Sequence, residues 1–240
     1  MLAFLAIGCG GGGGSSESTS NNTNESAAGI WEGSVTTTTE LPTAIAGLIA
    51  SNGKAFFLNA LPALLFGDVS VSGRNLNFSG FGFDEIFLNP ESVTMSGTVE
   101  TGSSITVSYS TAGEIGTISL LKASSTIGVY DRSSSLSTLQ GTWNDAITDA
   151  EGTWVFTISS VGTFSAIRVT DNCSMNGEFA TINVEKNEYA VTVTVTSCNE
   201  VNGNYTGLAF TSDANTFTDN VISIAITNSL NAGFFEATKQ

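Results

Sequence analysis

Residues 189–196 alternate strictly between large apolar side chains and alanine or threonine, and this pattern constrains the fold more than any other feature. The segment reads Tyr-Ala-Val-Thr-Val-Thr-Val-Thr. Successive side chains of a β-strand point to opposite faces, so a period of two residues predicts a strand with one buried face. The same period recurs at residues 154–159 and 221–226. No helical period of useful length is present, which predicts an all-β chain.

Turns rich in Asn, Gly, Asp and Ser separate these and further strand candidates. The candidates in the first half of the chain are Gly29–Thr38, Thr43–Ala50, Lys54–Asn59, Val69–Ser72, Asn75–Asp84, Ser92–Glu100, Ser104–Ser110, Gly116–Lys122 and Ile127–Asp131. Those in the second half are Gly141–Ile147, 154–159, Phe164–Thr170, Gly177–Glu185, 189–196, Asn204–Phe210, 221–226 and Gly233–Thr238. Asn52-Gly53 predicts a tight hairpin turn.

About eight short consecutive strands in each half favour up-and-down antiparallel barrels, because a closed barrel leaves no sheet edge open. A two-sheet sandwich is the main alternative. A membrane-spanning barrel would need an apolar outer band, whereas the face opposite the core is mostly Thr, Ser and Asn. We therefore expect two tandem β-barrel-like domains that face water.

The two halves begin and end alike, which predicts a duplicated unit of roughly 105 residues. Residues 29–31 (Gly-Ile-Trp) match residues 141–143 (Gly-Thr-Trp), and residues 127–131 match residues 232–236. An Ile-Ser pair precedes each ending, in 118–121 and 222–225. The expected segments are a truncated signal segment at 1–9, a flexible linker at 10–28, a first domain at 29–132 and a second at 139–240.

The N-terminus is a short apolar run that ends in Gly8-Cys9 and continues into a Gly/Ser-rich stretch. It resembles the end of a lipoprotein signal peptide, in which the cysteine becomes the acylated first residue. The run is shorter than a normal apolar region and no basic segment precedes it. We therefore expect lipidation at Cys9 and a true start codon upstream of Met1.

If Cys9 carries lipid, Cys173 and Cys198 remain as a pair. The strands predicted on either side of Asn187 form a hairpin whose register places Cys198 opposite Asn176. That position is within a few residues of Cys173, so a disulfide across the open end of the hairpin is sterically reasonable. Disulfides persist in oxidising compartments, which agrees with export. Free thiols are the alternative.

The composition excludes several classes of function. Lys plus Arg number 7 against 22 Asp plus Glu, the net charge is −15, and histidine is absent. Binding to nucleic acid or to anionic lipid headgroups requires clustered cationic side chains. Without imidazole there is no Ser-His or Cys-His nucleophile pair and no His-ligated zinc. We therefore expect a non-enzymatic protein without catalytic residues, metal or cofactor.

Phenylalanines in the first half are the candidate ligand-binding residues, because an eight-stranded barrel can enclose one small ligand. They are Phe56, Phe57, Phe78, Phe81 and Phe83. The alternative is that they pack the barrel core. The stretch from Leu41 to Phe66 is more apolar than one strand pair needs, so it is either core or a lid or contact patch at the barrel mouth.

Two acidic turns contain the oxygen-bearing side chains that Ca²⁺ prefers. They consist of Asp145, Asp149 and Glu151, and of Asp213, Asn215 and Asp219. Their spacing does not fit an EF-hand loop, and ordinary Asx-rich turns are the alternative interpretation.

Gly-x-Trp at the start of an eight-strand unit resembles the opening of calycin barrels, the lipocalins and avidins. The equivalent Trp of calycins plugs the closed end, which implies that role for Trp31 and Trp143, with ligand stacking as the alternative. A further pattern resembles that of a group of proteobacterial two-domain lipoproteins. It consists of Cys173-x-x-x-Gly177, Asn187-x-Tyr189-x-Val, Cys198 and Gly203-x-Tyr205-x-Gly-Leu-Ala209.

The resemblance to lipoproteins implies a location in the cell envelope. Gly10 and Gly11 lack the Asp that favours inner-membrane retention, which implies the outer membrane, facing either the periplasm or the surface. We expect a lipid-anchored protein that binds a small apolar ligand or an envelope protein. The alternative is a structural or adhesive surface module without a small-molecule ligand.

Overall fold

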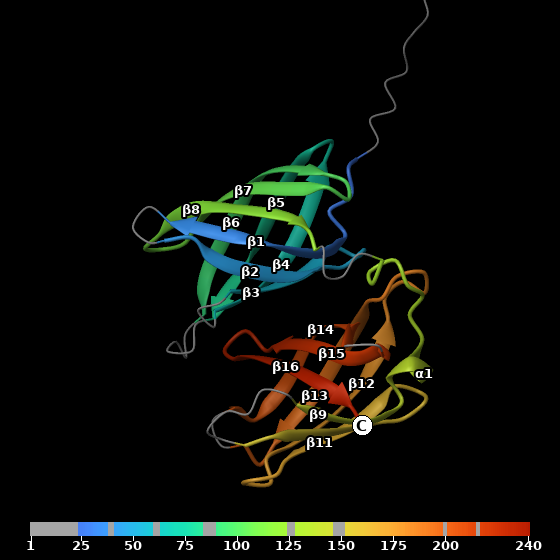
Figure 1. The fold of residues 1–240 in the computed structure, drawn as a ribbon. Helices are drawn as coiled ribbons and strands as arrows, with labels where there is room; N and C mark the ends of the chain where they lie inside the picture. The colour runs from blue at the N-terminus through green and yellow to red at the C-terminus, as the bar shows by residue number, and fades with distance from the viewer. Residues whose placement is uncertain are drawn as a thin grey trace, which may run out of the picture.

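The computed structural model describes residues 24–37, 41–59, 63–83, 90–123, 128–145, 152–198, 201–214 and 217–240. The described chain is nearly all β and forms two closed antiparallel barrels of eight strands each, as predicted (Figure 1). In each barrel, strands that follow one another in the sequence pair, and the last strand pairs with the first. None of the described helices is long and apolar enough to cross a membrane.

Barrel 1 contains the first eight strands. They are β1 (Gly29–Thr37), β2 (Thr43–Ile49), β3 (Lys54–Asn59), β4 (Leu64–Ser72), β5 (Asn75–Phe83), β6 (Glu91–Glu100), β7 (Ser104–Ser110) and β8 (Ile115–Lys122). The predicted Asn52-Gly53 turn joins β2 to β3, and its geometry requires glycine because Gly53 has a φ of 83°.

Barrel 2 follows a linker that contains the short helix α1 (Leu136–Leu139). Its strands are β9 (Gly141–Asp145), β10 (Trp154–Ile158), β11 (Thr163–Arg168), β12 (Ser174–Thr181), β13 (Tyr189–Thr196), β14 (Gly203–Ala214), β15 (Phe217–Thr227) and β16 (Ala232–Lys239). In Figure 1 the linker runs along the right-hand side of the molecule, past both barrels.

The chain enters each barrel at one end, where its first strand begins. The fully buried indoles of Trp31 and Trp143 lie close to this end. Trp31 Nε1 donates a hydrogen bond to the carbonyl of Ala27 at 2.9 Å, and Trp143 Nε1 donates to that of Leu139 at 2.8 Å. Each tryptophan thus ties the first strand of its barrel to the residues that precede it.

The interior of barrel 2 is packed with aromatic rings. Phe235 lies 5.6 Å from Phe156 and 5.9 Å from Trp154 between ring centroids, and Phe164 lies 4.9 Å from Phe179. These spacings are those of favourable edge-to-face and tilted ring pairs. The alternation predicted at residues 189–196 is confirmed, with the large side chains buried inside this barrel and the threonines exposed.

Some predicted strands are wrong in extent. Residues 128–131, from the candidate Ile127–Asp131, form turns between the barrels, and β8 is the strand that closes barrel 1. The equivalence of 118–121 with 222–225 is therefore also wrong, because β8 is the last strand of its barrel and β15 is the last but one. The candidate Gly177–Glu185 extends too far, because β12 ends at Thr181 and a long turn follows.

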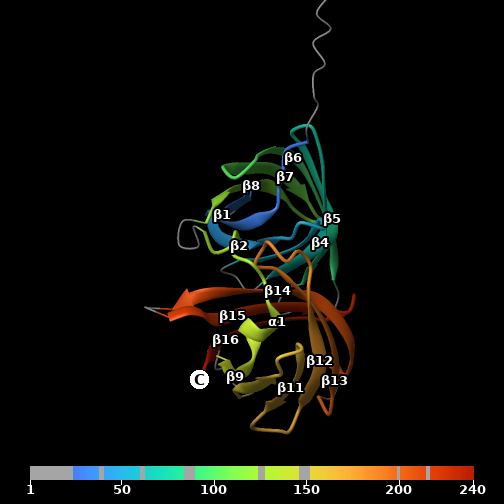
Figure 2. The ribbon, with the colours of Figure 1, turned by 90° about the vertical axis from the view of Figure 1, so that its right-hand side faces the viewer.

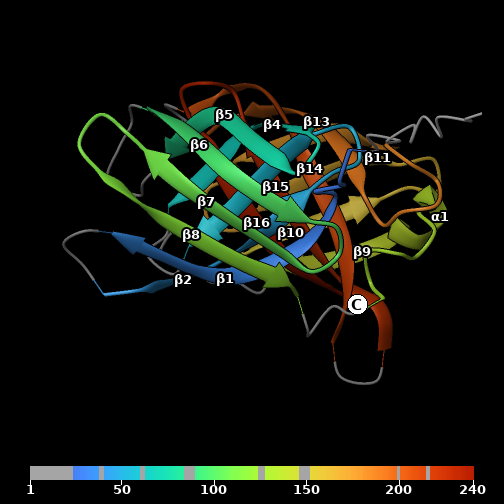
Figure 3. The same ribbon diagram turned by 90° about the horizontal axis from the view of Figure 1, so that it is seen from above.

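The two barrels stack with outer walls in contact (Figures 2 and 3). Strand β14 lies against β3, and β16 lies against β4. Phe56 is the centre of the contact, with ring centroids 6.3 Å from Phe210 and 6.2 Å from Phe234 of barrel 2. Leu48, Phe56, Leu64 and Phe66 all point out of barrel 1 and are buried in this cluster.

The stacking accounts for the apolar excess between Leu41 and Phe66. Alternate residues of this stretch, such as Ile45 and Phe57, fill barrel 1, and the residues between them form the contact with barrel 2. The stretch therefore contributes to the core, as one alternative predicted, but its contact patch lies on the outer wall of barrel 1 and not at the barrel mouth. Leu41 itself belongs to neither group, because its side chain is 86% exposed.

Candidate functional site

The candidate site is a cavity of about 270 Å³ at the open end of barrel 1. Its apolar wall consists of Val35, Ile45, Leu65, Val93 and Ile118, which come from β1, β2, β4, β6 and β8. These side chains point inward because each occupies the core-facing position of its strand. The volume is slightly below the roughly 300–1,000 Å³ of sites for drug-sized molecules, so a smaller ligand fits.

Polar groups line the cavity where the strands end. They are Asn59, Tyr109, Thr111, Glu91 and Glu114. The Thr111 hydroxyl accepts the backbone N–H of Glu114 at 3.1 Å, and Asn59 Oδ1 accepts that of Ala63 at 3.1 Å. The first bond fixes the turn between β7 and β8, and the second joins the end of β3 to the residue that precedes β4. A ligand with an apolar body and a hydrogen-bond-donating end therefore matches the apolar wall and the two carboxylates.

The phenylalanines predicted to bind ligand do not form one site. Phe57 and Phe78 pack inside barrel 1, with ring centroids 6.5 Å apart. Phe56 and Phe83 point outward and are buried where barrel 2 packs, and Phe83 also lines the cavity at the mouth of barrel 1. Phe81 also points outward, and its side chain is 44% exposed. Neighbouring residues of a strand face opposite sides, so a sequence cluster such as Phe56-Phe57 divides between two environments.

A polar clamp holds the barrels together beside the aromatic contact. Glu188, in the turn between β12 and β13, is fully buried. Its carboxylate accepts the backbone N–H of Ser51 at 2.9 Å, the Ser51 hydroxyl, and the Tyr130 hydroxyl at 2.8 Å. Ser51 belongs to barrel 1 and Tyr130 to the linker, so one side chain connects three parts of the chain.

The neighbouring Asn187 extends this clamp. Its side-chain amide donates to the carbonyls of Val129, at 3.2 Å, and Thr211, at 2.7 Å, and its oxygen accepts the N–H of Thr211 at 3.0 Å. Burial, and then the hydrogen bond to Glu188, raise the pKa of Tyr130 well above its usual value. The phenol therefore remains a proton donor throughout the range in which proteins are studied.

One of the two acidic turns proposed for calcium binds an arginine instead. Arg132 forms ion pairs with Asp213, at 2.5 Å, and with Asp219, at 3.1 Å. The hydrogen bonds from Arg132 lower the pKa of Asp213. Asn215 lies outside the described residues, as do Asp149 and Glu151 of the other turn. Within the described segments, no group of three or more metal-binding side chains of the His, Cys, Asp or Glu type is present.

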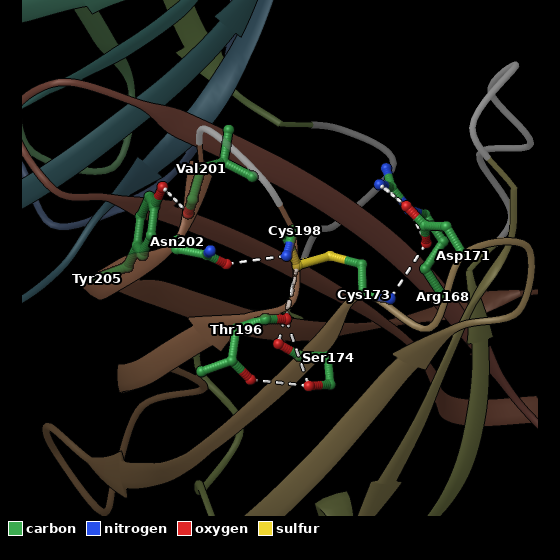
Figure 4. The surroundings of a disulfide bond; sticks show 9 residues. All are labelled: Arg168, Asp171, Cys173, Ser174, Thr196, Cys198, Val201, Asn202 and Tyr205. Carbon is green, nitrogen blue, oxygen red and sulfur yellow. Dashed lines mark hydrogen bonds and ion pairs between the residues drawn. A yellow bond between two sulfur atoms is a disulfide. The ribbon is translucent and has the colours of Figure 1, made fainter.

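The predicted disulfide joins Cys173, just before β12, to Cys198, just after β13, with their Cα atoms 4.6 Å apart (Figure 4). The predicted register was wrong, however, because Asn176 pairs with Thr194. The turn occupies residues 182–188 and is thus longer than expected, which shifts the pairing and brings Cys198 almost opposite Cys173. The Asn202 side chain accepts the backbone N–H of Cys198 at 2.8 Å and holds the same corner.

The cavity in barrel 1 and the polar clamp between the barrels were not predicted from the sequence. The cavity wall consists of ordinary aliphatic core residues, whose type carries no signal of a cavity. Glu188 and Asn187 resemble a solvated turn in the sequence, yet both are buried. The sequence could indicate the clamp only if the polar turn at Asn187 and Glu188 were considered together with the apolar excess between Leu41 and Phe66. Cys9 lies outside the described residues.

The candidate site is described from the geometry of this chain alone. The resemblances to calycins and to proteobacterial lipoproteins rest on short patterns of turn and core residues, and they assign no ligand. Comparison with models of protein families, with curated proteins and with solved structures found no match to this chain.

Proposed function

We propose that the protein is a lipid-anchored, non-enzymatic protein of the cell envelope that binds a small, mostly apolar ligand in the mouth of barrel 1. The observation that carries the ligand-binding proposal is the cavity of about 270 Å³ with an aliphatic wall and a polar rim. A ligand that displaces water from such a wall gains roughly 25 cal/mol for each Å² of apolar surface buried. The contrast with the ring-packed interior of barrel 2 favours barrel 1 as the binding domain.

The test uses the neutral apolar fluorophore N-phenyl-1-naphthylamine and the purified full chain. Val35→Trp places a large side chain in the cavity, and Val71→Trp is the matched control, because Val71 is also an inward-facing, half-buried β-strand valine of barrel 1 but does not line the cavity. We expect saturable binding that V35W abolishes and V71W retains. Equal binding by both variants, with unchanged unfolding midpoints, would refute the assignment to this cavity.

The membrane anchor is tested separately. The motif around Cys9 supports lipidation. Glu25, near the end of the predicted linker at 10–28, accepts the backbone N–H of Thr101 at 3.0 Å, which ties that end of the linker to barrel 1. In cells that express the full gene, we expect labelling by a radioactive fatty acid and recovery in the outer-membrane fraction. Cys9→Ala should remove both properties. A labelled C9A protein would contradict the proposal.

A specific observation favours the alternative function, an adhesive or structural module. Six neighbouring outward positions of β6 and β7 form an uncharged hydroxyl surface: Thr94, Ser96, Thr98, Thr106, Ser108 and Ser110. All of them are exposed, and β6 and β7 pair so that Ser96 faces Ser108. If purified protein retains no small molecule in native mass spectrometry, and V35W leaves the phenotype of the cells unchanged, the adhesive or structural function is favoured over ligand binding.

A further inference from the structure

A second hollow lies where the stacked barrels meet. It is a groove of about 720 Å³ between the outer wall of β1–β3 and that of β14–β16. Its lining includes Leu58 from barrel 1 and Phe210 and Phe234 from barrel 2, all of them half-buried. The exposed side chains of Ala44 and Ala46 continue the apolar surface. The volume falls within the roughly 300–1,000 Å³ of sites for small organic ligands.

The groove also contains a carboxylate from each barrel. Glu32, on β1, and Glu236, on β16, both line it. Among the described residues of the lining, none is lysine or arginine, and the whole chain has a net charge of −15. An apolar floor with carboxylates at its edge is complementary to a molecule that combines an apolar body with a positive charge. An anionic ligand would be repelled from the same surface.

We infer that this groove binds a small amphipathic cation, with an alkyl or aryl body against Phe210 and Phe234 and an ammonium group near Glu32 and Glu236. The site is composite, because barrel 1 provides most of its lining and barrel 2 provides the rest, including Phe210, Phe234 and Glu236, so it exists only while the barrels are stacked. Ile45 and Asn59 line both this groove and the cavity in the mouth of barrel 1, but the groove lies between the barrels and does not depend on the function proposed for that cavity. Apolar side chains that gather on an accessible surface are characteristic of interaction sites.

The test titrates the full chain with octyltrimethylammonium by isothermal calorimetry, below its micelle concentration. Octyl sulfate carries the same tail with the opposite charge, and tetramethylammonium carries the charge without the tail. We expect octyltrimethylammonium alone to bind, and its affinity to fall as salt is raised, because exposed charges are screened. Equal binding of octyl sulfate would overturn the inference.

Variants locate the binding. Glu32→Gln and Glu236→Gln should each weaken the binding of octyltrimethylammonium by about two- to fivefold, the size expected for a partly exposed ion pair. Glu178→Gln is the matched control, because Glu178 is an exposed β-strand glutamate of barrel 2 that does not line the groove. It should leave the affinity unchanged. An equal effect of all three variants would mean that only the net charge matters, and would overturn the site.

Groove-filling variants provide the steric test from both sides. Ala46→Trp fills the groove from barrel 1, and Ser212→Trp fills it from barrel 2. Either one, if folded by circular dichroism, should abolish binding of octyltrimethylammonium, whereas V35W should leave it intact. Loss of binding in V35W but not in A46W or S212W would place the cation in the mouth of barrel 1 and refute the groove. Failure of octyltrimethylammonium to bind at all would also refute it, without affecting the result with N-phenyl-1-naphthylamine.

Discussion

Replacing Glu188 by alanine removes the acceptor on which the polar clamp between the barrels depends. The carboxylate is fully buried and accepts hydrogen bonds from the Ser51 backbone, the Ser51 hydroxyl and the Tyr130 hydroxyl. The variant leaves all three donors without this acceptor. It also leaves a space between barrel 1 and the turn that precedes β13.

The cost depends on which donors water can reach. Ser51 is exposed, so water can replace the carboxylate there, and the net loss per bond is about 0.5–1 kcal/mol. Tyr130 is buried, and an unsatisfied buried hydroxyl costs about 1–3 kcal/mol. Release of the desolvated carboxylate offsets part of this loss. The expected decrease in the free energy of unfolding is therefore about 2–4 kcal/mol.

The assay is urea unfolding, followed by tryptophan fluorescence and by far-ultraviolet circular dichroism. Glu188→Gln keeps the shape and one acceptor, and should cost only about 1 kcal/mol. Glu185→Ala is the matched control, because Glu185 is an exposed glutamate in the same turn, and its effect should stay within about 0.5 kcal/mol. If E188A loses no more stability than E185A, the carboxylate is not a clamp and the reasoning fails.

The structure also predicts the sign of three further changes in the free energy of unfolding. Replacing Cys173 and Cys198 by serine should lower the free energy of unfolding by about 3–4 kcal/mol, as expected for a loop closed over a sequence separation of 25, and reduction of the native protein should give the same loss. Because the pKa of Tyr130 is raised in the folded state, its contribution to stability is complete below the unfolded pKa of about 10 and is lost as pH rises above that value. The free energy of unfolding should therefore fall by at most about 1.4 kcal/mol per pH unit above pH 10, and it should fall less steeply in Tyr130→Phe. Because Arg132 lowers the pKa of Asp213 in the folded state, the ionised carboxylate stabilises the fold above the unfolded pKa of about 3.9. Asp213→Asn should therefore lower the free energy of unfolding by about 1 kcal/mol or less at neutral pH, and it should reduce the loss of stability with falling pH below pH 4. An unchanged pH dependence of stability below pH 4 would contradict the pairing.

Much of the fold follows from local pattern. The period of two residues at 189–196 determines which side chains enter barrel 2, and the tight turns determine that neighbouring strands pair. Strand ends are less predictable, because they depend on partners elsewhere in the chain. Leu64 and Phe66 extend β4 toward its N-terminus, and their outward side chains are buried only because barrel 2 covers them.

The candidate sites could not be located from the sequence for a related reason. A cavity is space that side chains fail to fill, and the aliphatic residues of its wall are the same types that fill a core. The groove and the clamp need knowledge of which outer wall of one barrel meets which wall of the other. Phe56 and Phe234 are far apart in the chain, and nothing in either segment specifies that they meet.

The stacking of the barrels has a consequence for how this molecule can respond to ligands. The mouth of barrel 1 is built from a single domain, so its occupancy does not require barrel 2. The groove has walls from both domains, so a ligand bound there stabilises the stacked arrangement by an amount that rises with the ratio of free ligand concentration to Kd. Glu188 stabilises the same arrangement from inside the interface. A cation in the groove should therefore restore stability to the E188A protein, and E188A should in turn weaken the binding of that cation, because the two effects are linked through one equilibrium.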